Sequence, residues 1–179
     1  MKSNNISNLG AKMKTITIGF SRPKKANILS STIMWFDNTD YSHVFMSFKS
    51  ESLNRTLIYQ ANRYGVYFEG LKIFTDNNIV VKSYDIEISD ESHTKLLQKC
   101  VDMSGLHYGF LQILGLGIER TLGLIGIKTK NPIQDKNYIC SELIATLMKE
   151  CLNIDVPEDY NEVSPHDLDV LLEAHPSSQ

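Results

Sequence analysis

The sequence predicts an α+β domain in which antiparallel strands precede most of the helices. Two observations support this fold class. In the first half of the chain, apolar residues alternate with polar ones over short segments, which is the period of half-buried strands. In the second half, apolar residues recur every three or four positions, which is the period of helices with one buried face. A run of strands followed by helices is typical of the α+β class.

The first half supplies the predicted strands. Every second side chain from Ile16 to Phe20 is apolar, so a strand is predicted over Lys14 to Phe20. A turn over Ser21 to Lys25 follows, and the apolar residues between Asn27 and Phe36 favour a short helix. Four further strands are predicted, separated by polar or turn-forming residues: Tyr41 to Phe48, Thr56 to Asn62, Gly65 to Phe68 and Ile79 to Ile88.

Three helices are predicted in the second half. The first is capped by Ser89 and Asp90 and runs to about Met103, and the last begins at Ser164. Between them, the segment Cys140 to Leu152 is the clearest helix, because its apolar residues recur at helical spacing throughout.

The composition favours one globular domain. The chain has 179 residues, of which 42% are hydrophobic and 22% charged, an ordinary balance for a single core. We assign the domain to residues 13–175 and expect residues 1–12 and 176–179 to be flexible tails. The apolar segment Tyr108 to Lys128 carries Glu119 and Arg120 near its centre, so we do not expect a transmembrane span.

Charge and cysteine content exclude several functions. The formal net charge is only −3 and the basic residues are scattered, so no nucleic-acid partner is predicted. Three widely separated cysteines fit a reducing compartment and show no metal-binding spacing, so neither a metal nor another cofactor is predicted. The polar N-terminus lacks a signal peptide, which favours the cytoplasm, or a virion if the protein is phage-encoded.

Cys140 is the candidate nucleophile. It begins the clearest predicted helix, where unpaired backbone N–H groups and the helix dipole are expected to lower the pKa of a thiol. The same N–H groups suit an oxyanion formed during acyl transfer. The alternative is that Cys140, like Cys100 and Cys151, is a small buried apolar residue.

His43 is the candidate base, because the other four histidines fall in helix first turns, a loop or the terminus. If the hairpin is symmetric about the bond between Glu51 and Ser52, Gln60 lies opposite His43 and can accept a hydrogen bond from its Nδ1–H. Asn62 is the second candidate for this orienting role. Ordinary polar roles on the sheet remain open for both His43 and Gln60.

Three motifs resemble circularly permuted NlpC-type papain-like proteins, a branch that includes relatives of lecithin:retinol acyltransferase. They are Tyr41-Ser-His-Val44, then Leu57-Ile-Tyr-Gln-Ala61 followed by Gly65-Val66, and Tyr138-Ile-Cys-Ser-Glu-Leu143. In the permuted branch the histidine strand precedes the cysteine helix, as it does here. The resemblance covers about Thr15 to Leu172.

The resemblance implies a cysteine hydrolase in which Cys140 attacks an amide, His43 is the base and Gln60 orients the ring. The implied substrates are peptides or peptidoglycan-type amides. Since Gln60 carries no charge, it cannot stabilise an imidazolium as a carboxylate would, and activity is expected to be attenuated.

Two alternative functions remain open. The first is an acyltransferase, or a lipid or thioester hydrolase, with the glycine-spaced apolar segment Phe110 to Ile127 forming a wall or lid for an acyl chain. The second is an interaction or structural protein, such as a phage component, that keeps the fold and has little activity. The sequence does not indicate an oligomeric state.

Overall fold

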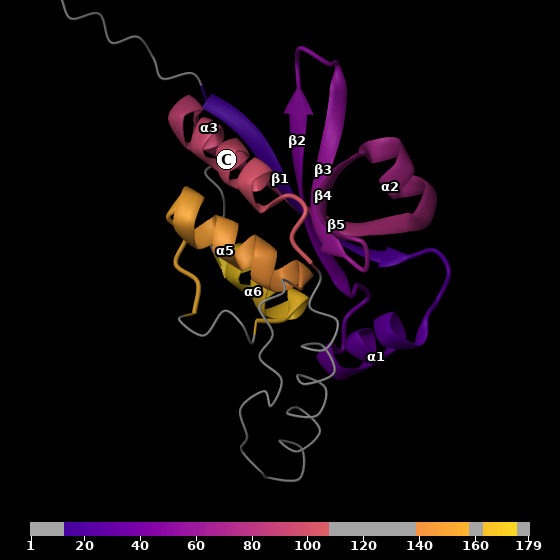
Figure 1. Ribbon diagram of the computed structural model, residues 1–179. Helices are drawn as coiled ribbons and strands as arrows, with labels where there is room; N and C mark the ends of the chain where they lie inside the picture. Colours follow the sequence, from indigo (N-terminus) through magenta and orange to yellow (C-terminus); the bar gives the residue numbers. More distant parts are fainter. Residues whose placement is uncertain (1–12, 108–138, 158–162, 175–179) are drawn as a thin grey trace, which may run out of the picture.

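The structure is a computed structural model that describes residues 13–107, 139–157 and 163–174. These residues form an α+β fold with a five-stranded antiparallel sheet and five helices, which confirms the predicted class (Figure 1). The predicted tails 1–12 and 176–179, and the whole segment Phe110 to Ile127, lie outside the described residues.

The strands are arranged in the order β4-β3-β2-β1-β5. Strands β2, β3 and β4 are consecutive in the chain and lie side by side; β1 lies next to β2, and the long strand β5 forms the edge beyond β1. Every neighbouring pair is antiparallel. The bounds are β1 Met13–Pro23, β2 His43–Ser50, β3 Arg55–Asn62, β4 Gly65–Gly70 and β5 Asn78–Ser89. Strand β1 continues through most of the predicted turn over Ser21 to Lys25, because Ser21, Arg22 and Pro23 pair with the start of β5.

Helices lie on both sides of the sheet. Figure 1 shows α3, α5 and α6 together on one side and α2 on the other. The bounds are α1 Ile28–Asp37, α2 Leu71–Asn77, α3 Asp90–Met103, α5 Cys140–Leu152 and α6 Pro165–Ala174. Helix α2 was not predicted, since seven residues are too few to display a helical period clearly.

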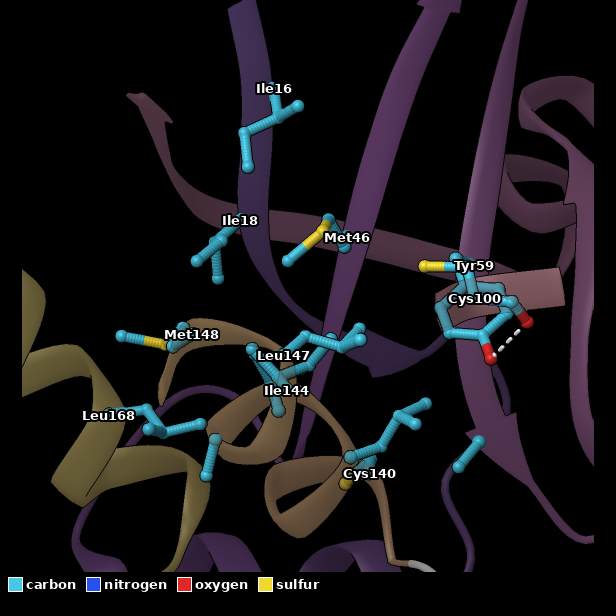
Figure 2. Packing of buried hydrophobic residues seen from close by; sticks show 14 of the residues in the cluster. Ile16, Ile18, Met46, Tyr59, Cys100, Cys140, Ile144, Leu147, Met148 and Leu168 are labelled. Carbon is cyan, nitrogen blue, oxygen red and sulfur yellow. Dashed lines mark hydrogen bonds between the residues drawn. The ribbon is translucent and has the colours of Figure 1, made fainter. Parts of the chain in front are cut away.

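The main core lies between the sheet and the helices α3, α5 and α6. Side chains at alternate positions of the central strands point into it, and those of α5 meet them (Figure 2). The sheet contributes Ile16, Ile18, Phe20, Val44 and Met46, and α5 contributes Leu143, Ile144, Leu147 and Met148. All nine are inaccessible to solvent, so this contact is the largest hydrophobic contribution to the fold.

A smaller apolar cluster covers the opposite face of the sheet. It consists of Phe45 from β2, Ile58 from β3 and Phe74 from α2. The Phe45 ring lies against Gly19 on β1, where a Cβ atom would be only 2.3 Å from the ring. Glycine is therefore required at this position for Phe45 to pack.

Helix starts follow the predicted capping residues. Ser89 accepts a hydrogen bond from the N–H of Ser92 at 3.1 Å, which caps α3. At α6, Ser164 and Asp167 form a reciprocal pair: each side chain accepts from the other residue's backbone N–H, at 3.3 and 2.8 Å. Both caps were predicted from the sequence.

The hairpin of β2 and β3 has a different register from the predicted one. Met46 pairs with Tyr59, and the loop of four residues from Glu51 to Asn54 centres the hairpin one residue later than expected. Asn54 adopts a left-handed conformation, with φ 46°, that closes this loop. The prediction that Gln60 lies directly opposite His43 was therefore wrong, although both residues keep the same face because the shift is even.

Helix α6 is held to the sheet by the buried carboxylate of Asp169. It accepts hydrogen bonds from the hydroxyls of Tyr41 and Tyr84, both at 2.6 Å, and pairs with Lys82 at 2.9 Å. Burial raises the pKa of Asp169, but these three donors outweigh it, so that the pKa lies below its ordinary value. The ionised form is therefore the one that stabilises the fold.

We expect Asp169→Asn to lower the free energy of unfolding by about 1–3 kcal/mol at pH 7, because charge-assisted hydrogen bonds are lost in a buried site. Urea denaturation measures the change. The exposed Asp155→Asn is the control and should be close to neutral. Since the native pKa is depressed, this contribution should be lost as the pH falls towards and below that pKa. Equal stability of the two variants at pH 7 would contradict the role of Asp169.

Candidate active site

Cys140 occupies the first position of α5, as predicted (Figure 2). The residue before it, Ile139, is the N-cap and supplies no side-chain cap, so the first N–H groups of the helix are open to other acceptors. The backbone N–H groups of Val44, Ser141 and Cys140 itself lie close enough to the thiol sulfur to lower its pKa. The sulfur therefore lies among three backbone donors, one of which belongs to β2.

The resting thiol is nevertheless neutral. Cys140 is only 6% exposed and is part of the main apolar core, and this burial raises the pKa of the thiol more than the three donors lower it. The expectation of a lowered pKa was wrong, because it considered the helix terminus without the desolvation that packing against the sheet imposes. Cys100 and Cys151 are also buried free cysteines.

His43 is the first residue of β2, and its ring lies near Phe74, with 6.4 Å between ring centroids. Burial lowers the pKa of His43 to about 4, and the hydrogen bond that His43 donates to Gln60 only partly opposes this shift. The imidazole is therefore neutral at pH 7. It can accept a proton, but it gains little stabilisation once it has become an imidazolium.

Gln60 is the hydrogen-bond partner of His43. Its Oε1 lies 2.7 Å from His43 Nε2, and the Gln60 side chain is 3% exposed. The sequence predicted a bond to Nδ1, whereas the structure uses Nε2 and leaves Nδ1 without a recorded partner among the described residues. The contact runs diagonally across the hairpin, since the pairing of β2 with β3 ends at Met46 and Tyr59.

Asn62, the second candidate for orienting the ring, has other partners. Its amide nitrogen donates to the Tyr67 hydroxyl at 2.6 Å, and its Oδ1 accepts from the backbone N–H of Tyr64 at 2.9 Å. It therefore belongs to the turn between β3 and β4. Of the two candidates, only Gln60 contacts the imidazole.

Glu69 is a residue that the sequence interpretation missed. Its Oε1 accepts a hydrogen bond from Gln60 Nε2, so the side chains of β2, β3 and β4 form a continuous chain from His43 through Gln60 to Glu69. The signal lay in the pairing of β3 with β4: Gln60 is opposite Tyr67, and Glu69 is two residues farther on the same face. Burial raises the pKa of Glu69.

Cys140 and His43 are connected through neighbouring residues of β2: Cys140 belongs to the main core on the α5 side of the sheet, whereas the His43 ring lies near Phe74 of α2 on the other side. The sulfur of Cys140 lies close to the backbone N–H of Val44, the residue directly after His43. Between these two described side chains, however, no hydrogen bond is present. The structure thus joins His43 to Gln60 and brings Cys140 to the adjacent backbone, and a proton transfer from sulfur requires a further approach of the ring.

Glu142 is a second carboxylate that the sequence interpretation did not consider. It is 8% exposed in the first turn of α5, and burial raises its pKa to about 7. The backbone N–H of Ile139 bonds the carboxylate and opposes this shift, in the manner of a capping-box glutamate. Its Oε2 is buried without a hydrogen-bond partner.

Two other features of the described residues bear on function. No group of three or more His, Cys, Asp or Glu side chains within these ranges is arranged to hold a metal ion. Every helix in the same ranges is too short or too polar to cross a lipid bilayer. Comparison of the chain with protein-family models gives no match, and comparison with curated proteins gives none either.

The lowered pKa of His43 predicts a loss of stability on acidification. Between pH 6.5 and about 4 the unfolded chain binds a proton at this residue and the native protein does not, so unfolding becomes easier as the pH falls. We expect a loss of up to about 3 kcal/mol from this residue, absent in His43→Gln. Urea denaturation at pH 7 and pH 4 measures it. The exposed His107→Gln is the control and should lose stability as the native sequence does.

Proposed function

We propose that the protein is a cysteine-nucleophile amide hydrolase with the circularly permuted, NlpC-type papain-like fold. One observation carries the proposal: the sulfur of Cys140, at the N-terminus of a helix, lies close to the backbone N–H of Val44, the residue next to His43, and His43 Nε2 is bonded to Gln60. A nucleophile, a base and an orienting group thus come from three separate elements, α5, β2 and β3. The order of histidine before cysteine supports the permuted arrangement.

The proposed reaction begins with a proton transfer. With Nε2 bonded to Gln60, Nδ1 of His43 is the nitrogen that takes the proton from the Cys140 thiol. The thiolate attacks the amide carbonyl carbon, and the resulting imidazolium gives the same proton to the departing amine as the C–N bond breaks. A thioester on Cys140 remains. Water then attacks it with His43 as base, which releases the carboxylic acid and restores the thiol.

The backbone donors around the sulfur provide for the oxyanion. The N–H groups of Ser141 and Cys140 at the helix start, and that of Val44 on β2, lie close to the thiol in the resting protein. When the sulfur has bonded to a carbonyl carbon, the carbonyl oxygen takes up negative charge close to these groups. Fixed N–H donors in a buried site stabilise such a charge strongly.

Burial sets the energetic demand on this reaction. Both partners are neutral at rest, since the pKa of the thiol is raised and that of the imidazole lies near 4. Formation of the ion pair is therefore unfavourable until a substrate supplies an electrophile. The proposed enzyme is one in which proton transfer and attack on the carbonyl are coupled, rather than one with a stored thiolate.

The substrate class proposed is a peptide or a peptidoglycan-type amide. The acyltransferase or lipid hydrolase alternative relied on the segment Phe110 to Ile127, which lies outside the described residues, so no observation favours it over amide hydrolysis. A weakly active interaction protein would share the buried neutral pair. Trapping of a covalent intermediate separates these possibilities.

We expect an acyl-enzyme on Cys140 when the protein is incubated with peptidoglycan-derived peptides and quenched in acid. Intact-protein mass spectrometry should detect the added acyl group, and peptide mapping should place it on Cys140. Cys140→Ala should abolish the adduct, and His43→Ala should reduce its rate at least 100-fold, the order expected for loss of a general base. Phospholipid and thioester donors are tested in parallel.

Cys100→Ser and Cys151→Ser are the matched controls, because both cysteines are buried but lie away from the start of α5. They should keep the adduct. An acyl adduct from phospholipid or thioester donors alone would replace the amidase with the lipid-directed alternative. No adduct from any donor, with all variants folded, would contradict an acyl-transfer function.

A further inference from the structure

Three side chains on three neighbouring strands form a hydrogen-bonded chain that ends on the candidate base. His43 Nε2 and Gln60 Oε1 are 2.7 Å apart, and Gln60 Nε2 donates to Glu69 Oε1. The strands β2, β3 and β4 that carry them are adjacent in the sheet. The chain therefore begins at a partly buried carboxylate and passes through one amide to the imidazole.

The carboxylate determines which way the Gln60 amide faces. An ionised carboxylate has no hydrogen to donate, so the amide group next to Glu69 has to be the NH2 end. The oxygen end then faces His43. An amide oxygen only accepts, so the imidazole nitrogen beside it, Nε2, has to carry the hydrogen.

The surroundings of Gln60 hold this orientation. The side chain is 3% exposed, so water is not available to replace either partner. Tyr67 is paired with Gln60 on β4. Burial raises the pKa of Tyr67, and the side chains of Asn62 and Gln60 oppose this rise, as expected of a second N–H of the Gln60 amide directed at the phenol oxygen. A flipped amide would direct its NH2 at His43 and its oxygen at Glu69, which leaves two acceptors facing each other.

We propose that Glu69 is a positioning residue that acts through Gln60 to keep the hydrogen of His43 on Nε2, so that Nδ1 is left as the basic nitrogen. This inference rests on the proposed function only for its consequence, namely that Nδ1 receives the thiol proton. The position of the hydrogen itself is a property of the resting protein.

Glu69 also aligns the dipole of the Gln60 amide. When Nδ1 has taken the thiol proton, the imidazolium keeps its Nε2–H bonded to Gln60, and the amide dipole is aligned by the carboxylate behind it. Glu69 thus acts on the imidazolium through the alignment of this amide, while burial keeps the pKa of His43 near 4.

The test measures the hydrogen position directly. Two-dimensional NMR of ¹⁵N-histidine-labelled protein at pH 7 distinguishes a ring nitrogen that carries hydrogen from one that does not. We expect the native protein to have His43 almost entirely in the Nε2–H form. In Glu69→Ala and in the isosteric Glu69→Gln, the amide loses its fixed direction, and the Nδ1–H form should rise to about a third or more.

Glu87→Gln is the matched control, since it makes the same substitution at an exposed position on β5. It should leave the hydrogen on Nε2. Circular dichroism and thermal unfolding establish that each variant is folded, and the two Glu69 variants give independent readings if one of them is not. A native protein with hydrogen on Nδ1, or folded Glu69 variants that keep the native form, would overturn the inference.

The rate of acyl-enzyme formation is measured on the same proteins, and we expect a reduction of at least 10-fold in the Glu69 variants. The two readings fail separately. If the His43 hydrogen shifts to Nδ1 in the Glu69 variants but the native protein forms no acyl-enzyme, the hydrolase proposal is rejected and the positioning role of Glu69 is supported. If folded Glu69 variants keep the hydrogen on Nε2 and form the acyl-enzyme at the native rate, the hydrolase proposal is supported and the positioning role of Glu69 is rejected.

Discussion

The packing of helix α5 against the sheet is the contact on which both the fold and the chemistry depend. Its apolar residues complete the core formed by the central strands, and its first residue, Cys140, is carried into that core with them. The position that gives the thiol three backbone donors also removes it from water. The two effects on the pKa have opposite signs, and desolvation is the larger.

Much of the fold was predictable because it depends on local patterns. The bounds of α5 and the caps at Ser89 and Ser164 follow from helical periodicity and from side chains that bond the backbone within three residues. The strand faces were also predictable, since alternation fixes which side chains share a side. The hairpin register was not, because a shift of two residues leaves every face unchanged.

The candidate site was predictable in its residue types and less so in its details. Cys140, His43 and Gln60 stood out by their place in the predicted elements, and the structure places Gln60 against His43. The sign of the thiol pKa depends on how deeply α5 packs, and the contact of Glu69 depends on the pairing of two later strands. The pKa shift of the thiol and the contact of Glu69 both depend on how distant segments pack together, so the periodicity of a local segment does not predict them.

The neutral, buried state of Cys140 has a consequence for the lifetime of the protein under oxidative stress. Peroxides react with thiolates, and they do so fastest where the sulfur is exposed. A thiol that is 6% exposed and holds its hydrogen at neutral pH is a poor target for such reagents. The sulfur should thus resist conversion to sulfenic or sulfinic acid, whereas an exposed and permanently ionised thiolate would not.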